Sequence, residues 1–249
     1  MTDDVQVSVA DGVMRITMNR PAKKNALTGP MYDAMTAALE RADASGDIRA
    51  VMLEGSGGSF TAGNDLADFL ATATRGDEPR ATYFIKAIAM LETPIVAAVD
   101  GVAVGVGTTL LFHCDLVYAT ETAKFRMPFL DLGLVPEAAS SILAPARFGM
   151  AKASEYILLA EAFGPQEAEK HGLVNGIVAP DLLGETAMNA ARKLAAKPPA
   201  ALRAARRLMR GDRKDIAAAI EREMVAFGEA LRSDDAKAAF TAFLSKAKA

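Results

Sequence analysis

The feature of this sequence that most constrains its fold is the alternation of short apolar runs with segments of helical periodicity. Residues 5–9 and 14–18 alternate apolar with polar side chains on either side of Asp11 and Gly12. Because alternation with a period of two marks a half-buried strand and the Gly-containing dipeptide marks a turn, these residues predict a β-hairpin.

The segments that follow predict helices and buried strands in turn. Thr28 is a suitable N-cap for a helix that has Pro30 in its first turn and continues to about Ala44, and the spacing of Phe84 and Ile88 indicates another helix. Short apolar runs that read as strands occupy 50–53, 95–99 and 116–118. Strands that alternate with helices are typical of an α/β fold with mostly parallel pairing.

Two further segments complete the organisation of the chain. Residues 71–82 have no apolar periodicity and predict a mobile surface loop, whereas almost continuous helix is predicted from Asp181 onward. We therefore divide the chain into an α/β core over 1–195 and a C-terminal helical region over 196–249. The last region carries an apolar stripe that indicates core or a subunit interface rather than a ligand site, formed by Ile216, Ile220, Met224, Phe227, Leu231, Phe240, Phe243 and Leu244.

Charge and hydropathy exclude two classes of partner. The 249 residues include 28 basic and 31 acidic side chains, a net charge of −3, so there is no excess of Lys and Arg to neutralise nucleic acid. The longest run without a charged residue, Gly101–Cys114, is shorter than the roughly 18–20 apolar residues that cross a membrane. Because the acidic amino terminus does not resemble a leader, we expect a cytoplasmic protein.

Cysteine and histidine are scarce. Cys114 is the single cysteine, and His113 and His171 are the two histidines, so an internal disulfide, a thiolate metal cluster and a three-histidine zinc site are excluded. We expect His113 and Cys114 to be packed residues and His171 to lie at the surface near a helix end. The remaining candidates for chemistry are carboxylates, hydroxyls and backbone amides, with no metal.

A glycine-rich segment, residues 55–66, follows the strand that ends at Leu53. A turn that leads from a strand into a helix presents free N–H groups at the positive end of the helix dipole, where they stabilise an anion. The alternative is a flexible turn in which Asn64 or Asp65 simply caps the helix.

A second glycine-rich segment, residues 100–110, follows the strand at 95–99. It matches neither the dinucleotide fingerprint, since Leu110 stands where a third glycine is needed, nor a P-loop, which requires a Lys-Ser or Lys-Thr pair. We expect a second helix N-terminus, with Gly105 and Gly107 allowing close backbone approach.

An isolated carboxylate, Glu137, follows Pro136. Proline suits the first position of a helix, so we expect Glu137 in a first helical turn, where it could merely complement the dipole. Glu137 is, however, the only charge between Asp131 and Arg147. Desolvation among apolar neighbours would raise its pKa and fit it for proton transfer at neutral pH.

These segments, in this order and spacing, resemble the crotonase family, also called the enoyl-CoA hydratase/isomerase family. The resemblance implies an α/β fold, the crotonase-like (ClpP/crotonase) spiral of ββα units, with a C-terminal helical trimerisation region. It also implies that the backbone N–H groups of Asn64 and Val106 form an oxyanion hole for a thioester carbonyl. The matching motifs are Asn19–Leu27, Phe60–Leu66, Pro94–Asp115, Gly172–Val174 and Ser233–Ala236.

The departures from the family are as informative as the matches. Hydratases carry two glutamates, but this chain has Thr109 at one position and Pro128-Phe129 at the other. Glu137 instead matches the single acid/base of the peroxisomal type of Δ3,Δ2-enoyl-CoA isomerases. The resemblance thus implies an enoyl-CoA isomerase of fatty acid metabolism that shifts a C3 double bond to C2, and Thr109→Ala should be mild. The alternatives are a hydratase or other acyl-CoA reaction of the family and a non-catalytic acyl-CoA-binding scaffold.

The resemblance also implies the partners. Coenzyme A is part of the substrate rather than a cofactor, and the assembly is a homotrimer or a dimer of trimers. The substrate contacts carried over from the family are Lys24, Ala26, Ala62, Asp65, Leu66 and Val104, with Phe243 and Lys246 of the terminal helix as weaker candidates.

Overall fold

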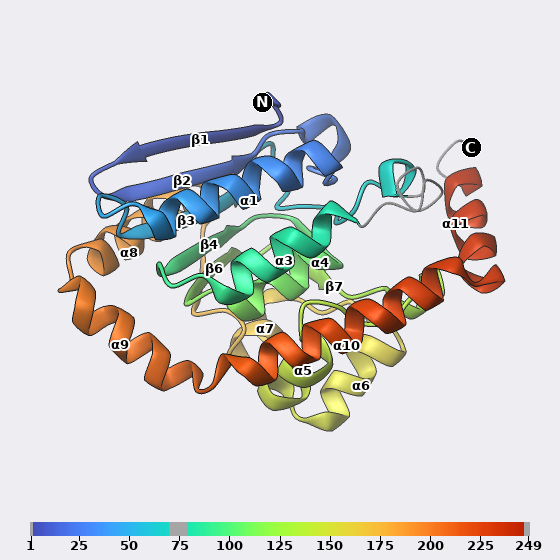
Figure 1. Cartoon of the computed structure of the whole chain (residues 1–249). Coiled ribbons are helices and arrows are strands. Elements are labelled where there is room, and N and C mark those ends of the chain that lie inside the picture. Colours follow the sequence, from blue (N-terminus) through green and yellow to red (C-terminus); the bar gives the residue numbers. More distant parts are fainter. Residues whose placement is uncertain (1, 70–78, 247–249) are drawn as a thin grey trace.

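A six-stranded sheet lies at the centre of the molecule (Figure 1), in a computed structural model that describes residues 2–69 and 79–246. The strand order is β1-β2-β3-β4-β6-β8. β1 and β2 form the predicted antiparallel hairpin, and every other neighbouring pair is parallel. The strands are β1 (Val5–Ala10), β2 (Val13–Met18), β3 (Ala50–Gly55), β4 (Ile95–Val99), β6 (Leu116–Thr120) and β8 (Gly176–Val178).

Helices cover both faces of this sheet. Successive strand side chains point to opposite faces, so Val13 and Met52 pack beneath α8 (Pro180–Ala195). Ile16 and Leu53 belong to the larger apolar core on the other face. That core includes the buried sides of α1 (Gly29–Ala44) and α3 (Arg80–Met90). Burial on both faces explains why β3 and β4 read as apolar runs.

A second, two-stranded parallel sheet lies beside the glycine-rich turns. It pairs β5 (Val102–Val104) with β7 (Lys124–Arg126), and α4 (Val106–Thr109) follows β5 directly. The remaining elements are the 3-10 helices η1 (Pro21–Lys23), η2 (Leu110–His113) and η3 (Leu130–Leu132), and the helices α5 (Ser140–Phe148), α6 (Met150–Leu158), α7 (Pro165–Lys170), α9 (Pro199–Arg210), α10 (Arg213–Arg232) and α11 (Asp234–Lys246).

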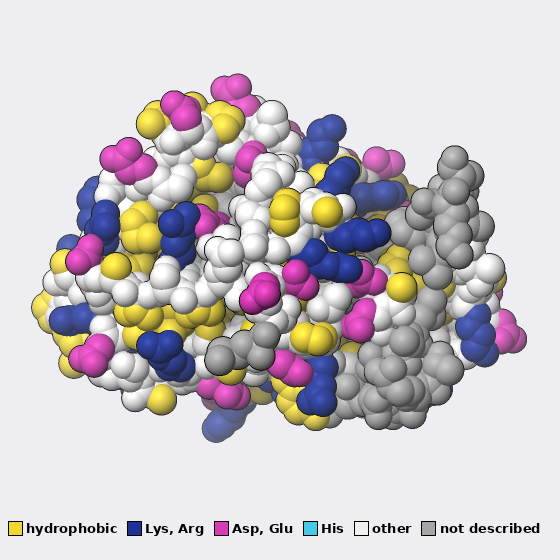
Figure 2. All heavy atoms as spheres, turned by 90° about the horizontal axis from the view of Figure 1, so that it is seen from above, with side chains coloured by type: hydrophobic (Ala, Val, Ile, Leu, Met, Phe, Trp, Pro, Cys, Tyr) yellow, Lys and Arg dark blue, Asp and Glu magenta, His cyan; other side chains and the backbone are white. Residues whose placement is uncertain are grey.

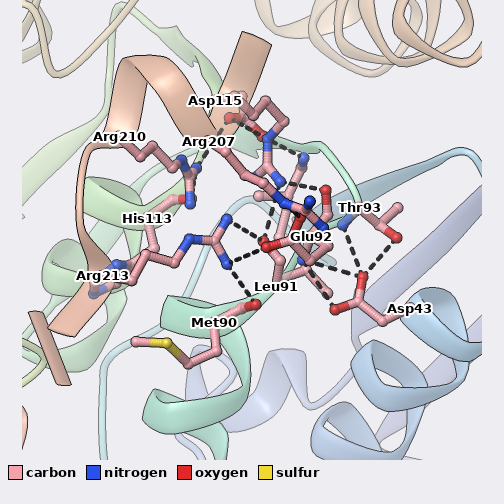
Figure 3. A network of polar contacts seen from close by, with 12 residues as sticks. Asp43, Met90, Leu91, Glu92, Thr93, His113, Asp115, Arg207, Arg210 and Arg213 are labelled. Carbon is pink, nitrogen blue, oxygen red and sulfur yellow. Dashed lines mark hydrogen bonds and ion pairs between the residues drawn. The ribbon is translucent and has the colours of Figure 1, made fainter. Parts of the chain in front are cut away.

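The predicted run of C-terminal helix is confirmed, and arginines join it to the core. Figure 3 shows Arg210 and Arg213 directed at the ends of core elements. Arg213 donates to the carbonyls of Met90 and Leu91 at the C-terminal end of α3, and Arg210 lies 3.0 Å from Asp115. Cations are favoured at a helix C-terminus, where carbonyls lack intrahelical partners. These contacts hold α9 and α10 against the body of the molecule (Figure 1).

The prediction of a surface loop over 71–82 is wrong at its end. Residues 70–78 lie outside the described part of the chain. Residues 80–82, however, form the first turn of α3, with Pro79 as N-cap. Ala81 and Thr82 are buried on the same face as Phe84, so the helix extends one turn before its obvious apolar residues.

The surface carries charges of both signs. Figure 2 shows Lys and Arg side chains gathered in the right half of the upper face, with Asp and Glu among them. Across the part of the chain that the structure describes, no helix is both long and apolar enough to span a bilayer.

Candidate active site

The two glycine-rich segments run side by side. Thr61 and Ala103 form a parallel bridge, in which the Thr61 N–H donates to Val102 at 2.9 Å and the Val104 N–H donates to the Thr61 carbonyl at 3.0 Å. Asn64 and Val106 each lie three residues beyond that bridge and line one cavity. Among the described residues, neither of their N–H groups donates a hydrogen bond. Two neighbouring main-chain donors are therefore available to a ligand.

Glycine makes this close approach possible. A Cβ on Gly63, whose φ is +84°, would lie 2.6 Å from the Val104 carbonyl oxygen, and one on Gly107 would lie 2.5 Å from Thr61 Cγ2. Gly105 has space around it, but its φ of +56° and ψ of −121° suit glycine alone. The predicted second helix N-terminus is confirmed, since α4 begins at Val106.

The cavity has a volume of about 720 Å³. Its walls combine the two free amides with apolar side chains and with the cations Arg20 and Lys23. The apolar side chains include Phe129, Leu132, Leu134, Phe227 and Phe240.

Most of the substrate contacts implied by resemblance line this cavity. Ala26, Ala62, Asp65, Leu66 and Val104 all do. Lys24 is not among the described residues that line it: its side chain is exposed and its carbonyl accepts the Ala62 N–H at 2.9 Å, while Lys23 lines the cavity instead. Phe243 and Lys246 belong to α11, but their side chains lie outside the described part of the structure.

The C-terminal helices contribute to the same cavity. Ile220 is buried in the core, as the apolar stripe predicts. Phe227 of α10 and Phe240 of α11 line the cavity, so the expectation that this stripe avoids a ligand site is wrong for these two residues. Periodicity identifies an apolar face but does not tell whether that face meets protein or a cavity.

Asp65 has the capping role that the sequence left open. Its Oδ1 accepts the N–H groups of Ala67 at 3.1 Å and Asp68 at 3.2 Å, and its Oδ2 lies 2.7 Å from Arg20 Nη1. Burial alone would raise the pKa of Asp65, but the bonds from Arg20 and the backbone lower it below its usual value. The main-chain N–H of Asn64, next to this cap, has no acceptor in the described structure.

Glu137 does not lie in a first helical turn, so that prediction is wrong. α5 begins at Ser140, and Ala138 and Ala139 both have positive φ, at +58° and +57°. A right-handed helix cannot pass through two such residues, which separate Pro136-Glu137 from α5. Glu137 therefore does not complement a helix dipole from within the first turn of a helix.

The Glu137 side chain is buried, at 4% exposure. Its Oε1 accepts a hydrogen bond of 2.5 Å from the Thr109 hydroxyl, while Oε2 has no partner within the described structure. Burial, opposed by the Thr109 bond and assisted by the charge of Glu223, raises its pKa from 4.5 to about 8. Thr109 lies three residues after Val106 in α4, so the carboxyl contacts the same helical turn that begins with the Val106 N–H. Glu137 itself is not among the described residues that line the cavity.

Tyr32 of α1 contacts Asn64 and is influenced by the charge of Glu137, but sequence reasoning does not identify it as a site residue. Its hydroxyl donates to Asn64 Oδ1 at 2.5 Å. Its pKa is raised, first by burial and then by the charge of Glu137. In the sequence it sits beside Met31 on the buried face of a helix, where an aromatic residue suggests packing.

His113 and Cys114 lie where the sequence places them, whereas His171 is at a helix end as expected but is less exposed than a surface residue. His113 and Cys114 are buried, and His171 is half-buried at the end of α7. Burial lowers the pKa of His113 to about 4 and raises that of Cys114 to about 12, so both are neutral at physiological pH. Within the described ranges there is no group of three or more His, Cys, Asp or Glu residues able to hold a metal ion.

Comparison with known proteins decides the family. The family model described as Enoyl-CoA hydratase/isomerase matches residues 8–249. The chain belongs to the enoyl-CoA hydratase/isomerase family. It is therefore an acyl-CoA-processing enzyme of the crotonase type.

Individual relatives of this family member carry different activities in their names. A protein named "Probable enoyl-CoA hydratase" from Rhizobium meliloti (strain 1021) is 35% identical over 244 residues, which are 94% of this chain and 92% of the relative. "Enoyl-CoA delta isomerase 2" of Rattus norvegicus is 36% identical over 227 residues, which are 88% of this chain and 57% of the relative. The names thus support the family rather than one reaction.

A solved structure confirms the crotonase-like fold. The enoyl-CoA hydratase/isomerase of Pseudoalteromonas atlantica T6c has a TM-score of 0.93 to this family member and is 42% identical, with 98% of each chain covered. The α/β spiral with C-terminal helices implied by the sequence is therefore present. The trimer or dimer of trimers remains a prediction.

Proposed function

We propose that this family member shifts the double bond of a 3-enoyl-CoA to C2, with Glu137 as the single acid/base. The observation that carries the proposal is one buried carboxyl, with its pKa raised to about 8, which accepts a hydrogen bond from Thr109 of the same short helix whose first residue, Val106, has a free main-chain N–H in the described structure. Thr109 and Phe129 stand where hydratases of the family carry carboxylates.

The reaction requires one proton to leave and one to return. The Glu137 carboxylate takes a proton from C2, and the electron pair of that C–H bond moves into a dienolate whose charge lies partly on the thioester oxygen. The N–H groups of Asn64 and Val106 stabilise that oxygen, as oxyanion-hole donors do. Glu137 then delivers its proton to C4, which leaves the double bond at C2 and regenerates the carboxylate.

The Oε2 atom of Glu137 suits this role. Oε1 is engaged by Thr109, whereas Oε2 is buried without a hydrogen-bond partner in the described structure. A base with a raised pKa gains more from accepting a proton, so burial makes Glu137 a stronger base than an exposed glutamate.

Both aspartates that line the cavity have partners within the described structure. Asp65 pairs with Arg20, and Asp68 accepts the Gly29 N–H at 2.8 Å. These contacts support the assignment of proton transfer to Glu137 rather than to either aspartate.

The rest of the cavity matches the two ends of an acyl-CoA. Arg20 and Lys23 supply positive charge for phosphates, and Ala26, Ala62 and Leu66 supply backbone near the nucleotide. Phe129 and its apolar neighbours provide surface for the acyl chain.

Hydration is the second candidate, because relatives of high coverage are named as hydratases. The pure enzyme mixed with 3-enoyl-CoA should develop the absorbance of a conjugated thioester, and no 3-hydroxyacyl-CoA should form from 2-enoyl-CoA. Hydration of 2-enoyl-CoA without isomerisation would favour the second candidate. Binding of CoA esters without any turnover would favour the scaffold.

The variant Glu137→Gln tests the assignment of the base. It should lose at least about 10²-fold in isomerisation, the usual contribution of a general acid/base, and should bind CoA esters as the unmodified enzyme does. Glu185→Gln, an exposed change on α8, is the matched control.

A further inference from the structure

The turn that follows Glu137 has an unusual conformation. The Ser140 N–H donates to the Glu137 carbonyl at 3.0 Å, and both residues between them are alanines with positive φ. Such turns normally use Gly, Asn or Asp, because a Cβ is disfavoured in this region. Something outside the turn must hold it in place.

Glu223 of α10 reaches this turn from a distant part of the sequence. Its Oε2 accepts the Ala139 N–H at 2.6 Å, and its Oε1 accepts the Ser141 N–H at 3.0 Å. Glu223 is buried, at 7% exposure. It therefore caps the start of α5, where Ala139 has no side chain able to do so.

His113 of η2 holds the other alanine. Its Nε2 lies 2.8 Å from the Ala138 carbonyl oxygen. Because a carbonyl only accepts, Nε2 must carry the proton, and burial keeps the ring neutral by lowering its pKa to about 4. Ala138 is thus held through its carbonyl and Ala139 through its N–H.

We infer that Glu223 is a positioning residue for Glu137, fixing the main chain at Ala139 and Ser141 so that the Glu137 carboxyl stays beside Thr109. This inference rests on the proposed function, in which Glu137 is the base. It adds a residue of the C-terminal helices to the machinery of the reaction, through a turn that begins at Glu137 itself.

If Glu223 only capped α5, replacing it would change the free energy of unfolding alone. If Glu223 positions Glu137, replacing it also changes kcat and the pKa of Glu137. The groups facing Glu137 are Tyr32 of α1, Thr109 of α4 and Glu223 of α10, with neutral His113 behind Ala138 and Arg222 acting on Glu223. The negative charge of Glu223 raises the pKa of Glu137, so its removal should lower that pKa.

The test compares Glu223→Gln with Glu223→Asp and with the control Glu229→Gln, an exposed change on the same helix. We expect Glu223→Gln to lower kcat about 10-fold or more, to change KM less than about 2-fold, and to move the acid limb of the pH profile to lower pH. Glu223→Asp keeps the charge but is too short to reach both N–H groups, so kcat should fall with a smaller shift of the acid limb. Glu229→Gln should behave as the unmodified enzyme.

A second measurement does not depend on catalysis. The carboxyl carbon of Glu137, labelled with ¹³C and assigned through Glu137→Gln, is titrated by NMR in each folded variant. A lower midpoint in Glu223→Gln supports the inference even if 3-enoyl-CoA proves not to be the substrate, which would refute the proposed function alone. Unchanged kcat and an unmoved midpoint in folded Glu223→Gln and Glu223→Asp would overturn the inference.

Discussion

The hydroxyl of Thr109 donates a hydrogen bond of 2.5 Å to the carboxyl of Glu137. By the family resemblance, Thr109 stands where hydratases carry a glutamate, and it contacts the base proposed for isomerisation. This hydrogen bond lowers the pKa of Glu137 against the effect of burial, and the mild effect expected of Thr109→Ala stays a prediction.

Thr109→Val removes this hydroxyl and keeps the shape of the side chain. Because the lost bond favoured the charged carboxylate, the pKa of Glu137 should rise further. The acid limb of kcat/KM against pH should move upward by about one unit, the equivalent of a hydrogen bond worth about 1.4 kcal/mol. The control Thr186→Val, on α8 across the sheet, should leave the pH profile of kcat/KM unchanged. If the acid limb does not move in Thr109→Val, the hydrogen bond between Thr109 and Glu137 is contradicted.

The buried carboxyl should also make folding stability depend on pH. The folded-state pKa of about 8 lies above the ordinary value of 4.5, so folding favours the protonated form. The stability contributed by that proton is complete below about pH 4.5 and is lost as pH rises through about 8. Glu137→Gln has no such proton to lose. The difference between its free energy of unfolding and that of the unmodified protein should therefore shift in its favour by at least about 1.4 kcal/mol from pH 5 to pH 8.5, the value of one pKa unit. Urea unfolding at the two pH values measures the gain, and an equal difference at both would speak against a raised pKa.

Tyr32→Phe tests the link between α1 and the segment that carries the Asn64 N–H. The variant loses the hydroxyl that bonds to Asn64 Oδ1, so the segment that presents the Asn64 N–H should be held less firmly. We expect kcat/KM to fall about 10-fold, as for the loss of one hydrogen bond. Tyr83→Phe, at a side chain that is 45% exposed, is the control. Equal losses in the two variants would show that the Asn64 contact is not responsible.

Gly107→Ala tests the close approach of the two glycine-rich segments. The new Cβ would lie 2.5 Å from Thr61 Cγ2, so the segments must separate. We expect a loss of about 1–3 kcal/mol in the free energy of unfolding, typical of overpacking, together with a large loss of activity. Gly184→Ala is the matched control: it lies in α8 with open space around it and should be neutral or stabilising. Both free energies come from urea unfolding, and a fully active Gly107→Ala would contradict the arrangement.

Much of the fold follows from the sequence because its signals are local. The alternation around Asp11-Gly12 identifies the hairpin, and glycine-rich turns identify where the chain approaches itself. Free N–H groups in the glycine-rich turns follow from the same local reasoning, since a strand that leads into a helix leaves N–H groups unpaired. The assignment of these groups to Asn64 and Val106 came from the family resemblance.

The parts that the sequence does not predict depend on contacts between distant residues. Ala138 and Ala139 carry no signal for a left-handed turn, because alanine favours a helix. The partners that hold this turn, His113 and Glu223, lie far from it along the chain, so the start of α5 was misplaced. The roles of Phe227 and Phe240 at the cavity likewise depend on how α10 and α11 fold back.

The transfer of one proton from C2 to C4 is the most direct test of the account. The enzyme is given 3-enoyl-CoA deuterated at C2, and the product is examined by NMR after a single turnover in ordinary water. A single buried base predicts that a measurable share of the deuterium appears at C4, and that Glu137→Gln gives no product in the same time. Product without any deuterium at C4, or product formed at the normal rate by Glu137→Gln, would contradict the role of Glu137.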